Sequence, residues 1–113
     1  MFSKALIAAT LKPIMLSILF RGEAYGYEII QRIQDLSDGK VQWTAGTLYP
    51  VLHRLEAEGL VETTWRASDE GPRRKYYRLT LHGRSAFEAE RRQWLDMHAL
   101  LVKLWGPTPE PAF

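Results

Sequence analysis

The sequence predicts a mainly helical domain of the α+β class, with one β-hairpin and a long carboxy-terminal helix. Three observations favour this class. Apolar residues recur at helical spacing in four segments, two β-branched and aromatic runs flank one turn, and the last segment carries an apolar seam. A chain of 113 residues has room for one such domain and can bury a modest core without disulfides.

The amino-terminal part of the chain predicts two helices. Residues 3–20 are rich in Ile, Leu, Met and Ala, and Pro13 predicts a kink or a restart there because proline has no backbone N–H to donate. A turn at "RGEA" follows, and residues 25–36 form the second predicted helix. Its apolar positions lie at helical spacing and are Ile29, Ile30, Ile33 and Leu36.

A third helix is predicted over residues 44–58, with Gly59 as its stop signal. One stripe of this helix is apolar and consists of Leu48, Val51, Leu52 and Leu55. Pro50 leaves two alternatives for its start. With Thr44 as the cap, Pro50 lies in the second turn and removes a hydrogen bond. With Thr47 as the cap, Pro50 lies in the first turn, where a missing donor costs little.

Two strand-like runs follow, "LVETTWRAS" at residues 60–68 and "RKYYRLT" at residues 74–80. The intervening "DEGP" supplies turn residues, so the two runs predict a hairpin. Because successive residues of a strand point to opposite faces, one of Tyr76 and Tyr77 is expected in the core and the other at the surface.

Residues 81–105 predict a long final helix. Phe87, Trp94 and Leu101 repeat every seven residues, which resembles one face of a coiled coil. The tail at residues 106–113 contains three prolines and is predicted to be disordered.

Basic charge is focused on one short segment. The net charge is only +2, yet residues 71–84 hold five cations and no acid, whereas residues 1–65 hold six cations and seven acids. Arg73, Arg74 and Lys75 are adjacent within this segment. An ordinary solvated surface is one explanation, but such a surface usually mixes both signs. The focusing is typical of a footprint for a polyanion.

The composition argues against several classes of protein. The absence of cysteine excludes disulfides, thiolate metal sites and cysteine nucleophiles. His53, His82 and His98 fall on different predicted elements without metal-binding spacing, and no nucleotide-binding or nucleophile-elbow motif occurs. We therefore expect a protein that is not an enzyme and has no cofactor, catalytic residue or metal site.

The apolar amino terminus does not have the pattern of a targeting segment. Lys4, Thr10, Lys12 and Pro13 interrupt it, and no A-x-A cleavage pattern follows. No run reaches the roughly 18 apolar residues of a membrane span. A cytoplasmic protein without a membrane partner is expected.

Two helices joined by a short turn and followed by a hairpin have the order of a winged helix-turn-helix. In that motif the second helix of the pair enters the major groove of duplex DNA. We predict that residues 1–80 form this DNA-binding domain and that residues 81–105 form a dimerisation helix. The hairpin is then the wing, and phosphates neutralise its adjacent cations.

Three blocks, "AYGYEIIQRI", "TAGTLYPVLHRLEAEGLVE" and "GPRRKYYRLTLHG", resemble the signature blocks of the PadR family of bacterial transcriptional regulators. The similarity covers roughly residues 12–105. The resemblance implies a homodimeric repressor of the shorter subclass, in which a single carboxy-terminal helix is the dimerisation arm. It also implies an inverted-repeat operator in double-stranded DNA.

The resemblance further implies which residues contact DNA. The groove-entering helix of the family matches residues 44–50, so Thr44 and Thr47 are expected at base edges or phosphate, and the Tyr49 hydroxyl at phosphate. The alternative for Tyr49 is an aromatic side chain at the edge of the core. The complete expected set is Tyr25, Thr44, Ala45, Thr47, Tyr49, Arg73, Arg74 and Lys75.

Trp94 matches, by its spacing from the wing, a position at which some PadR-like proteins stack planar aromatic compounds. An indole ring suits such stacking, and Met97 and His98 are expected to line the same region. His98 departs from the acidic residue of those relatives, which favours a phenolic or neutral aromatic inducer that releases the protein from DNA. The alternative for Trp94 is packing across a dimer interface.

Two other classes of function stay open. A protein-interaction module on a winged-helix scaffold predicts that alanine at Arg73, Arg74 and Lys75 leaves partner binding intact. A small-molecule-binding carrier predicts tight aromatic binding at Trp94 and weak, sequence-blind DNA binding.

Overall fold

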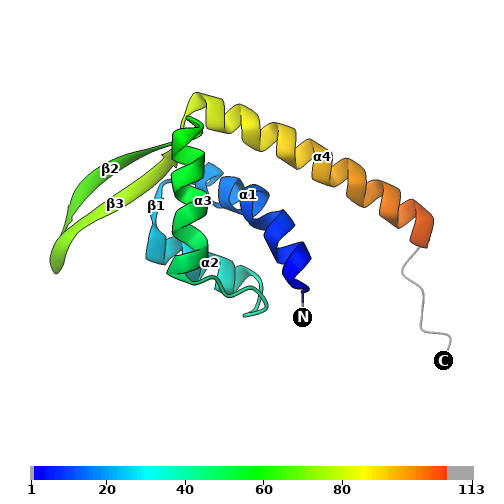
Figure 1. Ribbon diagram of the computed structural model, residues 1–113, viewed down its shortest axis with the longest axis horizontal. Helices are drawn as coiled ribbons and strands as arrows, with labels where there is room; N and C mark the ends of the chain where they lie inside the picture. Colours follow the sequence, from blue (N-terminus) through cyan, green and yellow to red (C-terminus); the bar gives the residue numbers. More distant parts are fainter. Residues whose placement is uncertain (1, 107–113) are drawn as a thin grey trace.

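The structure is a computed structural model and describes residues 2–106. The elements in chain order are α1 (Lys4–Phe20), β1 (Ala24–Tyr25), α2 (Gly26–Leu36), α3 (Ala45–Ala57), β2 (Val61–Ser68), β3 (Gly71–Leu79) and α4 (Leu81–Trp105) (Figure 1). The predicted helices and hairpin are confirmed, whereas the short strand β1 was not predicted. Apart from Gly106, the tail that the sequence predicts to be disordered lies outside the described residues.

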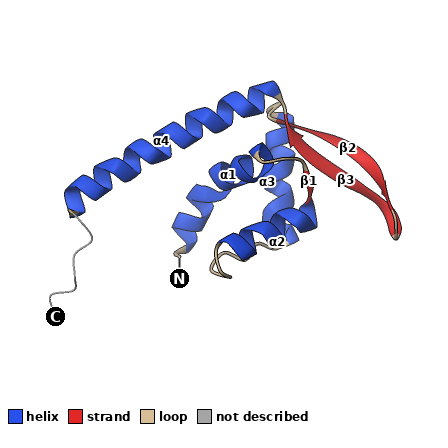
Figure 2. Cartoon of the chain, turned by 180° about the vertical axis from the view of Figure 1, so that it is seen from behind, coloured by secondary structure: helices blue, strands red, loops and turns tan. Residues whose placement is uncertain are grey.

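Helices α1, α2 and α3 form one body from which two elements project. Figures 1 and 2 show the β2–β3 hairpin extending from this body in one direction and α4 in the other. The molecule is elongated as a result, with principal extents of 56 × 29 × 21 Å. This is the winged helix-turn-helix arrangement, in which α2 and α3 are the helix pair and the hairpin is the wing.

The sheet is antiparallel, with the strand order β1-β3-β2. Strand β1 pairs with β3 at only two positions, Ala24 with Tyr77 and Tyr25 with Tyr76. The outer part of the wing, beyond these pairs, therefore consists of two strands alone. Tyr77 is 1% exposed and Tyr76 is half-buried, so the tyrosine of the core is Tyr77.

One core joins the three helices of the body to the roots of the strands. Its fully buried side chains include Met15 and Leu16 of α1, Ile29 of α2, and Leu48 and Leu52 of α3. Helix α4 adds Phe87, whose ring stacks on that of Phe20 with centroids 4.2 Å apart. Burial of this apolar surface is the main contribution to the stability of the body.

The cap of α3 resolves the two alternatives for its start. The Thr44 side-chain oxygen accepts a hydrogen bond from the backbone N–H of Thr47 at 3.3 Å, so Thr44 is the cap. Pro50 therefore lies inside α3, in its second turn, where it removes one backbone hydrogen bond of the helix, and its side chain is exposed. Helix α1 likewise continues through Pro13, so of the two alternatives predicted there, a kink or a restart, the restart is wrong.

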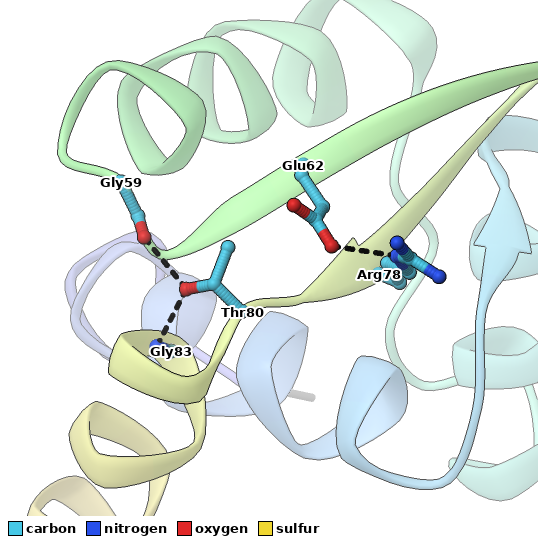
Figure 3. Close-up of polar contacts among 5 residues, drawn as sticks. All are labelled: Gly59, Glu62, Arg78, Thr80 and Gly83. Atoms are coloured by element: carbon cyan, nitrogen blue, oxygen red, sulfur yellow. Dashed lines mark hydrogen bonds and ion pairs between the residues drawn. The ribbon is translucent and has the colours of Figure 1, made fainter.

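A compact junction joins α4 to the end of α3. The Thr80 hydroxyl donates a hydrogen bond to the carbonyl of Gly59 at 2.7 Å and accepts one from the N–H of Gly83 at 3.0 Å (Figure 3). A Cβ atom at Gly83 would lie 1.9 Å from the carbonyl oxygen of Leu60, so only glycine permits this approach. The base of α4 is thereby fixed to the body.

Within residues 2–106, no helix is both long enough and apolar enough to span a membrane.

Candidate nucleic-acid interface

The amino-terminal end of α3 is open to solvent on the side away from the core. Thr44 and Ala45 are exposed and Thr47 is half-buried, while Leu48, Val51 and Leu52 are buried as predicted. The first backbone N–H groups of a helix lack intrahelical partners, and the helix dipole makes this end attractive to anions. This end of α3 therefore presents small polar side chains in a setting that favours negative charge.

Tyr49 is held between α3 and the start of α2. It is 37% exposed, and its hydroxyl oxygen would be 2.2 Å from a Cβ atom at Gly26, so the phenol packs directly on the backbone of that glycine. Its ring centroid lies 6.4 Å from that of His53, one turn further along α3. Tyr49 thus packs between the two helices while part of its ring remains accessible. The sequence contained no signal for the role of Gly26.

Tyr25 stands at the start of α2, and its backbone N–H donates a hydrogen bond to a carboxylate oxygen of Glu28 at 3.2 Å. Its ring meets the ring of Tyr76 edge to face, with centroids 5.4 Å apart. The guanidinium of Arg74 lies 4.5 Å from the centre of the same ring. Tyr25 and Arg74 belong to separate blocks of the sequence, and the sheet brings them into contact.

The three adjacent cations of the wing point in different directions. Arg73 and Arg74 are exposed and Lys75 is half-buried, with its ammonium 5.4 Å from the ring centre of Tyr77. None of the three forms an ion pair with an acid among the described residues, whereas Arg78 pairs with Glu62 at 2.7 Å (Figure 3). The segment therefore keeps three cations that no carboxylate of residues 2–106 neutralises.

A hollow of about 480 Å³ lies between α3, the start of α2 and the wing. Four of the predicted residues line it, namely Tyr25, Tyr49, Arg74 and Lys75. His53 and Trp65 also line it, and sequence reasoning missed both: His53 lies beyond the part of α3 that was matched to DNA contacts, and only the register of the wing brings Trp65 to this side. Burial, reinforced by Tyr49 and Glu56, raises the pKa of Tyr77 to about 12, so this phenol stays protonated even at a pH where an ordinary tyrosine ionises.

The predicted ligand residues are neighbours on α4 but do not line one pocket. Trp94 is 37% exposed and lines a separate groove of about 960 Å³ between α1, α2 and α4, and its indole N–H donates to Glu90 at 3.1 Å. Met97 and His98 are exposed and do not line this groove. Leu95 is the last residue of α4 that lines the groove, so within residues 2–106 Met97 and His98 lie outside it.

The fold, the open end of α3 and the basic wing define a winged helix-turn-helix protein suited to duplex DNA. A sequence model described as the PadR-like family of transcriptional regulators matches residues 15–89. The chain belongs to this family. It is therefore a transcriptional regulator, and the members of this family are regulators and not enzymes.

Individual proteins resemble the chain over half of its length or more. The chain is 30% identical over 96 residues to the uncharacterized protein X of Lysinibacillus sphaericus, covering 85% of this chain and 88% of that protein. It is 48% identical over 59 residues to the transcriptional regulator Rv3488 of Mycobacterium tuberculosis, a match that covers 52% of this chain and 54% of that protein.

Solved structures extend the likeness to most of the chain. A transcriptional regulator from Clostridium thermocellum superposes with a TM-score of 0.81 at 29% identity and covers 91% of this chain and 97% of its own. A PadR-like transcriptional regulator from Bacillus cereus gives a TM-score of 0.80 at 30% identity, covering 92% of this chain and 99% of its own.

Proposed function

We propose that the protein is a homodimeric repressor that occupies an inverted-repeat operator. The observation that carries the proposal is that α3 and the wing line one hollow: α3 contributes Tyr49, and the wing contributes Arg74 and Lys75, which have no carboxylate partner among the described residues. In such a complex α3 enters the major groove and the wing lies over the neighbouring backbone or minor groove.

The interface residues divide into two roles in this proposal. Thr44, Ala45 and Thr47 meet base edges, where hydroxyls hydrogen-bond and the alanine methyl suits a thymine methyl. Tyr25, Tyr49 and the three wing cations Arg73, Arg74 and Lys75 contact phosphates and fix the register of the protein on the duplex. The aromatic and basic lining of the hollow supports this division.

The second copy is proposed to dock on the outer half of α4. Large apolar side chains there are exposed to solvent, among them Leu100, Leu104 and Trp105. Two protomers joined through these helices would present their α3 helices about 34 Å apart, the distance of one turn of DNA. The two-fold symmetry of the dimer would match the symmetry of an inverted repeat.

The last part of the proposal concerns release from DNA by a small aromatic ligand. The groove beside Trp94 is apolar, with Phe87 and Leu95 in its lining, and its size suits a planar aromatic compound. Met97 and His98 would join such a site only through a rearrangement or a second copy. Quenching of Trp94 fluorescence by a phenolic compound, together with weaker operator binding, is the expected result.

The experiment that tests the proposal is fluorescence anisotropy with a duplex from the upstream region of the protein's own gene and a shuffled duplex, at two salt concentrations. We expect tighter binding to the native duplex. Replacing Arg73, Arg74 and Lys75 by alanine should reduce the slope of log affinity against log salt by about one for each phosphate that the protein no longer neutralises.

A control removes the same charge elsewhere on the protein. Lys4→Ala, Lys12→Ala and Arg21→Ala change helix α1 and its carboxy-terminal cap, outside both the proposed DNA contacts and the outer half of α4, and should leave the salt slope close to that of the wild type. If both triple variants lose affinity equally, or if the native and shuffled duplexes bind alike at every operator tested, the carrier and protein-interaction alternatives replace the repressor.

A further inference from the structure

One face of the sheet carries a continuous chain of five side chains, which we call the outer stack: Glu23, Arg66, Tyr76, Tyr25 and Arg74. The carboxylate of Glu23 forms an ion pair with Arg66, whose guanidinium lies 5.1 Å from the ring centre of Tyr76. The Tyr76 ring meets Tyr25 at an interplanar angle of 76°. The guanidinium of Arg74 lies over the ring of Tyr25, 4.5 Å from the ring centre.

The strand register explains why these five residues meet. Tyr25 of β1 is directly opposite Tyr76 of β3, and Arg66 of β2 is directly opposite Arg74 of β3. Two like charges in a directly opposed pair destabilise a sheet. Here each guanidinium lies over a different tyrosine, and Glu23 neutralises the guanidinium of Arg66. The stack therefore allows two arginines to stand directly opposite each other.

The outer stack acts where the wing is weakest. Strand β1 ends at Tyr25, so the part of the wing beyond Tyr76 is a hairpin of two strands without a third. An isolated two-stranded hairpin is only marginally stable in water. The stack links Arg66 and Arg74, which belong to this outer part, to Glu23 and Tyr25, which lie in the short segment between α1 and α2.

Stacking on a ring leaves an arginine free to bind a phosphate. The face of the guanidinium contacts the aromatic ring, while its N–H groups point outward from the edge and suit a phosphate. A side chain that is already ordered loses less rotamer freedom on binding. Arg74 can therefore keep its contact with Tyr25 while it donates to the DNA backbone.

We infer that the outer stack orders the wing and holds Arg74 in the conformation that contacts DNA. Glu23, Arg66 and Tyr76 are positioning residues in this arrangement, and Tyr25 is the platform on which Arg74 rests. The inference rests on the proposed function, since it assigns a target to Arg74. It adds two residues, Glu23 and Arg66, that the family resemblance did not indicate.

The sharpest test uses two variants with the same charge change. Glu23→Gln removes a carboxylate from the stack, and Glu62→Gln removes the carboxylate that pairs with Arg78 on the same face of the sheet. Electrostatics alone would make both variants bind DNA more tightly. We expect Glu23→Gln to bind the operator about 3- to 10-fold more weakly, as for the loss of a cation–π arrangement, and Glu62→Gln to bind unchanged or more tightly.

The ring of Tyr76 provides a second test with its own rescue. Tyr76→Leu should weaken operator binding to a similar extent, whereas Tyr76→Phe should restore it because the ring is retained. In an Arg74→Ala background, Tyr76→Leu should have no further effect. Equal losses in both backgrounds, or equal effects of Glu23→Gln and Glu62→Gln, would overturn the inference.

Hydrogen exchange separates failure of the stack from failure of the proposed function. In the protein without DNA, the amides of residues 64–75 should exchange faster in Glu23→Gln than in Glu62→Gln, with the amides of α3 unchanged as a check on folding. If the wild type prefers no operator, the proposed function fails, and Arg74 has no target. Equal exchange in the two variants would overturn the ordering role whether or not the wild type binds DNA.

Discussion

The body and the outer half of α4 are built in opposite ways. In the body, apolar side chains of α1, α2 and α3 meet in one core. In residues 91–105 of α4, which we call the outer arm, no residue is buried. The outer arm nevertheless carries the exposed apolar residues Trp94, Leu95, Met97, Leu100, Val102, Leu104 and Trp105. Such a surface is typical of a helix that another molecule covers, so the chain contains one self-sufficient unit and one that association would complete.

The largest difference in stability between the two regions is expected when one leucine in each is truncated to alanine. Leu52 is fully buried and Leu104 is 72% exposed. Leu52→Ala should lower the free energy of unfolding by about 2–5 kcal/mol, because it leaves a cavity, and Leu104→Ala by less than about 0.5 kcal/mol. Urea denaturation, at a protein concentration that favours the monomer, measures both free energies of unfolding. Similar losses would mean that the outer arm already packs on its own body.

A charge in the outer arm should act on association and not on folding. Leu100→Glu would bury an unpaired carboxylate in the proposed dimer, so we expect the dissociation constant to rise by about 100-fold. Sedimentation velocity measures this change, and circular dichroism checks that the monomer stays folded. Leu81→Glu, at the exposed start of α4, is the matched control. A Leu100→Glu protein that remains a dimer would place the interface elsewhere.

The smallest effect lies at the junction between the two regions. Thr80→Ala removes the hydroxyl that bonds both Gly59 and Gly83, and should lower the free energy of unfolding by about 1–2 kcal/mol. Thr80→Ser keeps the hydroxyl and should recover most of that loss. Thermal unfolding of the three proteins at equal concentration is the measurement, and an unchanged Thr80→Ala protein would show that the junction contributes no stability.

Local patterns were sufficient to predict the helices and the wing, because each depends on spacing and turn residues within a short window. The cap of α3 was not decided by sequence, since both Thr44 and Thr47 suit that position, and only the hydrogen bond to Thr44 distinguishes them. Strand β1 is two residues long and has no pattern of its own.

The candidate site depends more strongly on contacts between distant segments. The need for glycine at position 26 comes from the Tyr49 hydroxyl, and the pairing of Glu23 with Arg66 comes from the position of the wing. Trp94, Met97 and His98 are neighbours on a helix, but the path of α4 decides which of them faces the body. The DNA contacts of Thr44, Ala45, Thr47 and the wing cations stay predictions.

The junction at Thr80 and Gly83 makes α4 a lever. A helix of 25 residues is about 37 Å long, and its base is fixed to the end of α3. If α4 rotates by about 5° about its carboxy-terminal end, its amino-terminal end moves by about 3 Å over that length. This displacement is close to the 3.4 Å rise of one base pair of DNA. An angular change too small to disturb the packing of the body would therefore shift α3 by about one base pair.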